Sequence, residues 1–251
     1  MFLKERQAKI IELINAEGRV TVADLAQRFS VTEDCIRKDL KQLDAQGALK
    51  KVYGGALSVA SAPDRNVSKR VGSHIAEKRV IAEKALEQIA SGDTIFLDVS
   101  TTNLALAELL AKGSKQVFVV SNMMEILRTL ATNPALTVLG TGGSVNTELD
   151  GFIGTMALAC LKPMRFDKVF LGGLGVDLET GDVTTYVWDD AMIKQLVIAN
   201  SRRSFLVVDE HKFGIGGNYV YASVSSFDAL ITDRPSTKLR AQIKDLGSIV
   251  I

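Results

Sequence analysis

The stretch from Thr21 to Ala56 constrains the fold of this chain most, because two short helical patterns follow one another there with a tight break between them. Thr21 is the predicted N-cap of the first helix, and Asp24, three residues later, completes a capping box. The apolar residues of this segment have the spacing of one buried helix face: Val22, Leu25, Ala26 and Phe29. Ser30-Val31 interrupts that spacing, so we expect the first helix to end there.

A second helix is predicted directly after this break. Thr32 offers its N-cap, and Glu33 and Asp34 lie in its first turn, where the helix dipole favours acidic side chains. The apolar stripe consists of Ile36, Leu40 and Leu43, and three basic side chains lie off that stripe: Arg37, Lys38 and Lys41. Gly47 follows the last turn, and glycine is a common helix stop.

Segments on either side of this helix pair complete a small domain. Leu3 to Glu17 carries apolar residues at helical spacing, which predicts a helix that packs on the other two. After the pair, residues 49–53 alternate between apolar and basic side chains, and Gly54-Gly55 turns the chain back. This order predicts a winged helix-turn-helix, in which three helices precede a two-stranded hairpin with a glycine-rich tip.

The basic residues of this domain suit the phosphates and base edges of duplex DNA. Arg37 has the geometry to contact guanine bidentately or to bind a phosphate, whereas Lys38 and Lys41 suit phosphates. A solvated, mixed-charge helix explains any one of these residues alone, but the ordered set of caps, turn, basic face and hairpin favours DNA binding. The predicted DNA-binding surface consists of Thr32, Arg37, Lys38, Lys41, Lys50, Lys51 and Tyr53.

The same segment, TEDCIRKDLKQLDAQGALKKVYGGA, resembles the N-terminal signature of the DeoR family of bacterial transcription regulators. That signature runs T-I-R-R-D-L, then L-x-x-x-G, then a basic pair and a Gly-Gly-Ala tail. Cys35 stands where the family usually has threonine, and Lys38 where it usually has a second arginine. Lysine keeps the charge but lacks the planar guanidinium, so we expect Lys38 to contact phosphate.

Length and composition fit two domains in a reducing compartment. The chain has 251 residues, 47% of them hydrophobic, and it has neither a run of eighteen apolar residues nor a secretory start, so we expect no membrane span and no export. Cys35 and Cys160 form no CxxC pair, which argues against disulfides and a zinc finger and favours a cytoplasmic protein. We predict no cofactor and no metal.

Charge is distributed unevenly along the chain. Residues 1–79 hold 15 Lys and Arg against 10 Asp and Glu, whereas residues 80–251 hold 15 against 19. A basic N-terminal part on an acidic body is typical of a DNA-binding domain joined to a domain that does not contact DNA.

Three segments are predicted: a winged helix-turn-helix domain at 1–57, a linker at 58–72 that contains Ser, Pro and Gly, and a second domain at 73–251. In the second domain, short apolar runs alternate with helical patterns, which predicts an α/β fold with a mostly parallel sheet. Strands are expected at 94–98, 116–122, 136–140, 168–173, 204–209, 229–233 and 248–251. Helices are expected at 75–89, 104–110, 123–131, 156–161, 190–199 and 237–246.

Polar residues and glycines follow the predicted strands or lie near them. Because ligands of such sheets bind beyond the carboxyl ends of the strands, these residues are candidates for an effector site. They are Asp98, Ser100, Thr101, Thr102, Asn103, Asn122, Gly142, Gly143, Asp190 and Lys212. Hydroxyls at a helix N-terminus together with a lysine suit the phosphate of a phosphorylated polyol, and the carboxylates suit its hydroxyl groups. Taken singly, the same residues also fit an ordinary N-cap, a turn and a solvated charge.

Blocks of the second domain also resemble the DeoR family, in its C-terminal effector domain, which is similar in fold to ribose-5-phosphate isomerases. They are LDVSTTNLALA, VVSN, GTGGS, FLGGLGVD and VDEHKFG. Ser100 replaces a family glycine, and Asp189-Asp190 with Lys194 stands where the family often has glutamates and a lysine. The resemblance implies that the effector is a phosphorylated sugar or related metabolite, without choosing a member of that class.

We predict a transcriptional regulator, a repressor of a carbohydrate catabolism operon, that binds a double-stranded operator as a homo-oligomer and has no enzymatic activity. The alternative is a sugar-phosphate isomerase with a DNA-binding appendage. Against it, His74 lies at the linker edge and His211 in a strand-exit loop, and neither has a motif around it. A dinucleotide sensor is the third hypothesis, but Leu178 takes the place of the last glycine after Gly173-Leu174-Gly175.

Overall fold

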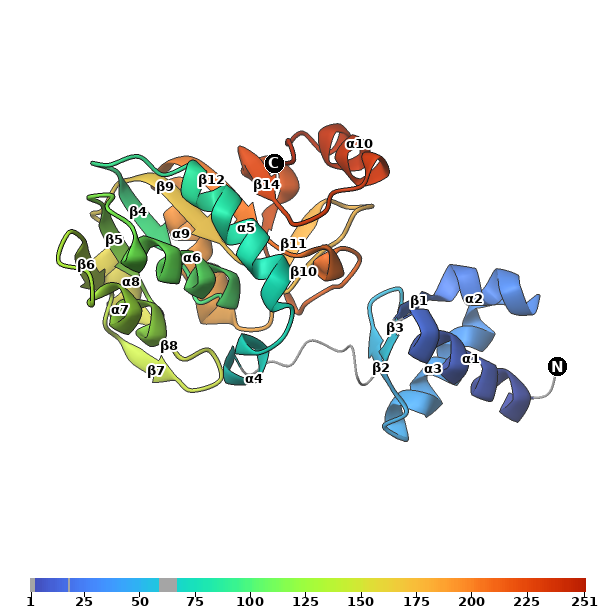
Figure 1. The fold of residues 1–251 in the computed structure, drawn as a ribbon. Coiled ribbons are helices and arrows are strands. Elements are labelled where there is room, and N and C mark those ends of the chain that lie inside the picture. Colours follow the sequence, from blue (N-terminus) through green and yellow to red (C-terminus); the bar gives the residue numbers. More distant parts are fainter. Residues whose placement is uncertain (1–2, 18, 59–66) are drawn as a thin grey trace. The chain divides into compact units, whose positions relative to one another are not determined.

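The computed structural model describes residues 3–17, 19–58 and 67–251, and Figure 1 shows their helices and strands. The chain divides into two compact units, Met1–Pro63 and Asp64–Ile251. Residues 59–66 of the predicted linker lie outside the described part of the chain. Within the described ranges, no helix combines the length and the apolar character that crossing a bilayer requires.

The three helices predicted for the first unit are confirmed. They are α1 (Leu3–Glu17), α2 (Val22–Phe29) and α3 (Glu33–Ala45). Thr21 caps α2 by accepting the Asp24 N–H at 3.1 Å, and Thr32 caps α3 by accepting the Cys35 N–H at 3.3 Å. Ser30 ends α2 in the left-handed conformation, at φ 53°, and thereby produces the tight break before α3.

A three-stranded antiparallel sheet completes the first unit. Its strands β1 (Arg19–Thr21), β2 (Leu49–Val52) and β3 (Gly55–Ser58) pair in the order β1-β3-β2. The hairpin of β2 and β3 is the predicted wing, whereas β1 was not predicted, because three residues carry too little periodicity. A Cβ atom at Gly55 would lie only 2.1 Å from the Val20 carbonyl oxygen, so the close pairing of β1 and β3 requires glycine there.

Apolar side chains from all three helices form the core of the first unit. Fully buried members of this core are Ile10, Ile14, Leu25, Ile36 and Leu40. A buried ion pair joins α1 to α3, with 2.5 Å between Arg6 Nε and Asp39 Oδ2. One face of α3 is therefore packed inside the unit, and its other face is left to solvent.

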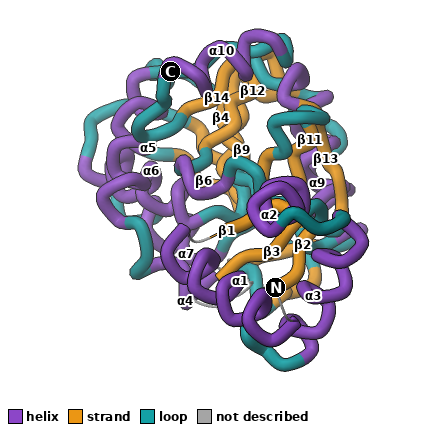
Figure 2. The backbone as a smooth tube through the Cα atoms, turned by 90° about the vertical axis from the view of Figure 1, so that its right-hand side faces the viewer, coloured by secondary structure: helices purple, strands orange, loops and turns teal. Residues whose placement is uncertain are grey.

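A six-stranded parallel sheet forms the centre of the second unit (Figure 2). Its order is β14-β12-β9-β4-β5-β6, and all pairings between neighbours are parallel. The strands are β4 (Thr94–Leu97), β5 (Phe118–Ser121), β6 (Thr137–Gly140), β9 (Phe166–Leu171), β12 (Ser201–Val207) and β14 (Ala229–Ile231). These strands were predicted. The prediction of a further strand at 248–251 is wrong, because this segment contributes only an isolated bridge between Val250 and Leu230.

Helices cover both faces of this sheet (Figure 1). One face packs against α5 (Ile75–Glu87), α6 (Thr101–Lys112) and α7 (Met124–Leu130). The other packs against α8 (Thr155–Leu161), α9 (Trp188–Ala199) and α10 (Thr237–Asp245). All six correspond to predicted helices, with small shifts at their ends, so the predicted α/β class is confirmed.

Several antiparallel strands of the second unit were not predicted. They form a sheet of β10 (Gly175–Val176), β11 (Asp182–Thr185) and β13 (Tyr219–Ser223), and a hairpin of β7 (Ser144–Asn146) and β8 (Gly151–Ile153). β10 also removes the basis of the dinucleotide hypothesis. Gly175 begins this strand instead of a strand-to-helix turn, and a Cβ atom there would lie 1.9 Å from the Ile215 carbonyl oxygen.

A short helix, α4 (Val67–Val71), occupies part of the stretch predicted as a linker. Val67 is buried, and its N–H donates to the Glu148 carbonyl oxygen at 2.8 Å. The described end of that stretch therefore packs as part of the second unit. Two valines among polar residues give too short a periodic signal, which is why the sequence suggested an unpacked segment.

Candidate functional site

The exposed face of α3 carries basic residues that were predicted to bind DNA. The buried positions of α3 are Ile36, Asp39, Leu40 and Leu43. Arg37, Lys38 and Lys41 lie between them in sequence and are exposed to solvent. Because an α-helix turns once in 3.6 residues, this alternation gives α3 a buried apolar face and a solvent-facing basic one.

The Arg37 guanidinium is held near the start of α3 by acidic side chains. It lies 2.6 Å from Glu33 Oε2 and 3.4 Å from Asp34 Oδ1, and about half of each of the Arg37 and Glu33 side chains is exposed. Exposed pairs of this kind contribute only about 0–1 kcal/mol, so a phosphate or a guanine edge competes readily for the guanidinium. The pairs orient Arg37 without locking it.

The wing presents three further residues of the predicted surface, and the seventh, Thr32, is exposed at the N-cap of α3. Lys50 and Lys51 are exposed on β2, and Tyr53 at the hairpin tip is 90% exposed. The Lys51 N–H donates to Asp44 Oδ1 at 3.0 Å, which ties β2 to the end of α3. This hydrogen bond anchors the wing to α3. The Tyr53 ring is so exposed that it contributes nothing to the core of the first unit.

Two adjoining hollows of the second unit lie where parallel strands end. Together with the adjoining space open to solvent, the first has a volume of about 550 Å³ and the second of about 370 Å³. Arg70, Ser100, Gly172 and Gly173 line both hollows, so we describe them together as the strand-end cavity. Ser100 follows β4 and Gly172 follows the neighbouring β9, which is the location expected for a ligand of a parallel sheet.

The N-terminus of α6 forms one wall of the strand-end cavity. Ser100 Oγ caps this helix by accepting the N–H groups of Thr102 at 3.2 Å and Asn103 at 3.4 Å. Thr101 and Thr102 line the second hollow. A Cβ atom at Gly172 would lie 2.7 Å from Ser100 Oγ, so glycine there leaves the space that the serine occupies. Such a helix N-terminus carries partial positive charge and suits an anion.

Three basic side chains line the same hollow as α6: Arg70, Lys78 and Lys212. Burial lowers the pKa of Lys212 to about 8; Asp209 opposes this shift, and the positive charges of Arg70 and Lys78 add to it. Burial also lowers the pKa of Lys78, whose ammonium donates to the carbonyl oxygens of Arg70 and Ser73. These cations repel one another in a small space, and a bound anion would offset that repulsion.

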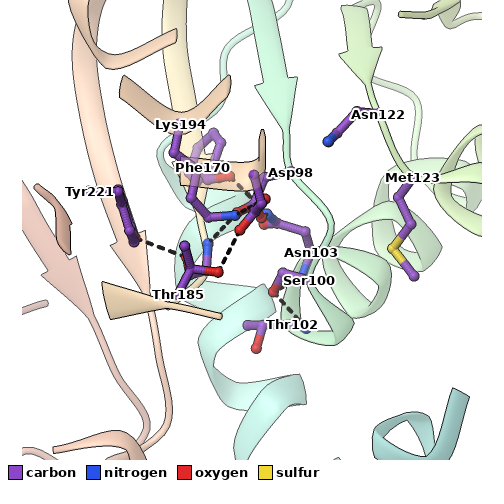
Figure 3. A network of polar contacts seen from close by, with 12 residues as sticks. Asp98, Ser100, Thr102, Asn103, Asn122, Met123, Phe170, Thr185, Lys194 and Tyr221 are labelled. Carbon is purple, nitrogen blue, oxygen red and sulfur yellow. Dashed lines mark hydrogen bonds and ion pairs between the residues drawn. The ribbon is translucent and has the colours of Figure 1, made fainter. Parts of the chain in front are cut away.

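A buried polar network lies beside the cavity (Figure 3). Lys194 Nζ is 2.7 Å from Asp98 Oδ2 and 2.6 Å from Asp190 Oδ1, and Thr185 Oγ1 donates to Asp190 Oδ2 at 2.7 Å. Asn103 Nδ2 donates to Asp98 Oδ1 at 2.6 Å. The network thereby connects α9 to the end of β4 and to the first turn of α6.

Charge in this network is balanced around one lysine. Burial raises the pKa of Asp98 above its ordinary value, although the nearby Lys194 lowers it in part. Burial alone would lower the pKa of Lys194, but Asp190 and Asp98 together raise it above its ordinary value. Lys194 therefore remains an ammonium ion, and it holds the two carboxylates together beneath the cavity.

The structure brings together some of the residues predicted for the effector site. Ser100, Thr101, Thr102 and Lys212 line the second hollow, and Ser100 and Asp190 line the first. Asp98 and Asn103 are fully buried and bonded to each other, and neither lines a hollow.

The remaining predicted residues lie elsewhere. Asn122 is fully buried, and its Nδ2 atom donates to the Phe152 carbonyl oxygen at 3.3 Å. Gly142 and Gly143 have positive φ angles, and a Cβ atom at Gly143 would lie 2.6 Å from the Ile153 carbonyl oxygen. Neither Asn122 nor these glycines lines the two hollows. Gly143 permits a close approach of two backbone segments.

Sequence reasoning missed two of the cations. Arg70 belongs to α4, inside the stretch predicted as a linker, and Lys78 lies on α5, where a lysine fits an ordinary polar helix face. Both reach the cavity only through tertiary packing. The local sequence carries no signal for either role, apart from the surplus of basic residues before position 80.

Comparison with known proteins assigns both units. Residues 6–62 match the DeoR-like helix-turn-helix domain, and residues 73–234 match the DeoR C terminal sensor domain. The chain is 33% identical to the glycerol-3-phosphate regulon repressor of Escherichia coli (strain K12) over 231 residues, which cover 92% of this chain and 91% of that protein. It is 31% identical to the lactose phosphotransferase system repressor of Streptococcus mutans serotype c over 234 residues, 92% of each chain.

Among solved structures, ribose 5 phosphate isomerase A from Neisseria gonorrhoeae aligns with a TM-score of 0.38 and 17% identity, over 61% of this chain and 55% of that one.

The two domain matches follow the order that the sequence predicted, a DNA-binding domain and then a sensor domain for a small effector. Proteins with this pair of domains regulate transcription and are not enzymes, so the isomerase alternative is set aside. The chain belongs to the DeoR family of DNA-binding transcriptional regulators.

Proposed function

We propose that this chain represses a carbohydrate operon and that a phosphorylated sugar or polyol, bound in the strand-end cavity, changes its affinity for operator DNA. α3 enters the major groove, and the wing lies beside the phosphate backbone. Arg37 contacts a base edge, while Lys38, Lys41, Lys50 and Lys51 contact phosphates.

One observation supports a phosphorylated effector most: a helix N-terminus and three cations line the same hollow. The first turn of α6 supplies the hydroxyl groups of Ser100, Thr101 and Thr102, and Arg70, Lys78 and Lys212 supply positive charge. A phosphate monoester carries about two negative charges and three acceptor oxygens near neutral pH, which matches this set of donors.

The first hollow suits the carbohydrate part of the same ligand. Its lining includes Thr185, Asp190 and Lys194, whose oxygen and nitrogen atoms bond hydroxyl groups well. The names of two relatives agree with this class: one represses a glycerol-3-phosphate regulon, and the other a lactose phosphotransferase system. Hydroxyl-bonding groups of this kind accept many sugars and polyols.

Arg70 offers a route by which the ligand acts on the DNA-binding unit. It lines both hollows and belongs to α4, the first described element after the stretch that joins the two units along the chain. An anion that attracts Arg70 changes the position or the stability of α4 at the point where the chain enters the second unit. A homo-oligomer, with one winged domain for each operator half-site, completes the proposal.

A gel-shift experiment with the full chain tests this function. The probes are promoter fragments from the genes next to its own, and the added compounds are glycerol 3-phosphate, hexose 6-phosphates and the same sugars without phosphate. We expect binding to at least one fragment and a change in affinity with a phosphorylated compound only. Binding that responds equally to unphosphorylated sugars would contradict the effector class, and failure to bind any fragment would contradict the regulatory role.

A further inference from the structure

The two histidines of this chain lie next to each other although they are far apart in the sequence. The imidazole centroids of His74 and His211 are 4.3 Å apart, and the ring planes differ by 40°. Glu77 lies one helical turn after His74. One ligand atom from each of the three residues lies within 4.8 Å of the other two. The DNA-binding surface does not include this cluster, and of its three residues only His74 lines the strand-end cavity proposed for the effector.

The distances suit a bound metal ion. Donor atoms bound to one tetrahedral ion at about 2.0–2.1 Å lie about 3.3 Å from one another. His74 and His211 are exposed and Glu77 is half-buried, so their side chains have room to rotate toward that separation.

The backbone around His74 is fixed in an unusual conformation. His74 precedes α5 with a φ angle of 50°, in the left-handed region that few residues other than glycine adopt. Its carbonyl oxygen accepts the Lys78 N–H at 3.0 Å, and the Lys78 ammonium bonds the Ser73 carbonyl oxygen. On the other side of the cluster, the His211 N–H donates to Asp209 Oδ1 at 3.1 Å. Both histidines are thus held on defined backbone segments.

We propose that His74, Glu77 and His211 bind a divalent transition metal ion of the Zn²⁺ type. Two imidazole nitrogens and one carboxylate oxygen supply three ligands, and water or a small anion takes a fourth position. Because His74 also lines the strand-end cavity, the ion lies at the edge of that cavity. It joins the segment before α5 to the loop that follows β12. This proposal does not depend on the identity of the effector.

The ligand types favour a transition metal over Mg²⁺ or Ca²⁺ at this place. Lys78 and Lys212 lie on the same elements as the proposed ligands and oppose a further positive charge. Mg²⁺ and Ca²⁺ depend on several oxygen ligands, usually carboxylates, and Glu77 is the one carboxylate of the cluster. Imidazole nitrogen binds Zn²⁺, Ni²⁺ or Cu²⁺ through its lone pair and does not need a negative charge.

Nuclear magnetic resonance of the full, tag-free chain tests this proposal without any substitution. Because the chain contains two histidines, ¹⁵N-labelling of histidine gives one set of ring signals for each site. Addition of one equivalent of ZnCl₂ is expected to shift the signals of both rings together. If Zn²⁺ shifts neither ring, or only one of them, the proposed site does not exist.

Titration calorimetry with ZnCl₂ on four variants provides the matched comparison. His74→Asn keeps a residue type that tolerates the left-handed conformation. His74→Asn and His211→Ala should each weaken Zn²⁺ binding by about tenfold or more. Glu83→Gln, which changes an exposed acid on the same helix, and the double variant Cys35→Ser/Cys160→Ser should bind Zn²⁺ as the wild type does. Unchanged affinity in His74→Asn, or lost affinity in the cysteine variant, would overturn the assignment.

Discussion

Lys194 Nζ lies 2.7 Å from Asp98 Oδ2, and both side chains are almost completely buried. Lys194 belongs to α9 and Asp98 follows β4, so this ion pair joins a helix on one face of the sheet to the end of a central strand. Asp190 contributes a second carboxylate at 2.6 Å from the same ammonium. Two buried carboxylates beside the strand-end cavity therefore share a single buried counter-ion, the Lys194 ammonium.

Removing that cation should destabilise the second unit strongly. Lys194→Met is expected to lower the free energy of unfolding by about 3–5 kcal/mol, because it leaves two buried carboxylates without a counter-charge. Asp98→Asn should cost clearly less, since the pair of Lys194 and Asp190 remains. Urea unfolding followed by the fluorescence of Trp188, the one tryptophan of the chain, reports on this unit. Equal losses in both variants would contradict the role given to Lys194.

Arg37 is expected to set sequence preference. Arg37→Ala should weaken binding to the operator by about 1–3 kcal/mol and change weak binding to unrelated DNA much less. Lys9→Ala, on the exposed side of α1, is the control and should leave both affinities unchanged. Fluorescence anisotropy with labelled operator and scrambled duplexes measures both. Wild-type discrimination in Arg37→Ala would place this side chain outside the groove.

Lys38 and Lys41 should act through phosphates. Each substitution by alanine is expected to weaken binding to all duplexes to a similar extent and to reduce the slope of log affinity against log salt by about 1. The same anisotropy titrations, repeated over a range of KCl concentrations, provide that slope. An unchanged slope together with lost discrimination would mean that these lysines contact bases instead.

Lys212 is expected to affect the ligand response and not DNA binding. Lys212→Ala removes one charged donor from the phosphate end of the cavity, so the concentration of sugar phosphate that changes operator affinity should rise about tenfold or more. Lys238→Ala, an exposed lysine on α10, serves as the matched control. A ligand titration that does not differ between Lys212→Ala and wild type would remove Lys212 from the effector site.

Gly55 should be intolerant of any side chain. Gly55→Ala introduces a Cβ atom 2.1 Å from the Val20 carbonyl oxygen, so β1 must separate from β3, and we expect a loss of about 2 kcal/mol or more in the first unit. A Cβ atom at Gly72 meets nothing within 4 Å, which makes Gly72→Ala the control. Hydrogen exchange of the amides in residues 19–21 and 55–57 detects the separation. Native protection in Gly55→Ala would show that the strands adapt.

Much of the fold was predictable because its signals are local. The caps at Thr21 and Thr32 and the glycine turn after β2 define the winged unit, and continuous apolar runs define the parallel strands. The antiparallel strands β10 and β11 gave no such signal, because short strands are stabilised by their partners and not by their own pattern.

The strand-end cavity was predictable only in part. Ser100 and Lys212 lie in the segments that follow β4 and β12, so the rule for ligands at strand ends identified them. Arg70 and Lys78 reach the cavity from helices, and tertiary packing alone brings them there. The same rule also selected Asn122, which the fold buries away from both hollows, because a rule based on sequence order does not distinguish the two directions in which a strand-end side chain points.

The most direct test is a DNase footprint of the full chain on the promoters of the genes beside its own, with and without a phosphorylated sugar. We expect a protected site that requires Arg37 and whose protection changes with the ligand in the wild type but far less in Lys212→Ala. A protected site that persists in Arg37→Ala and is insensitive to every phosphorylated compound would contradict the proposed function.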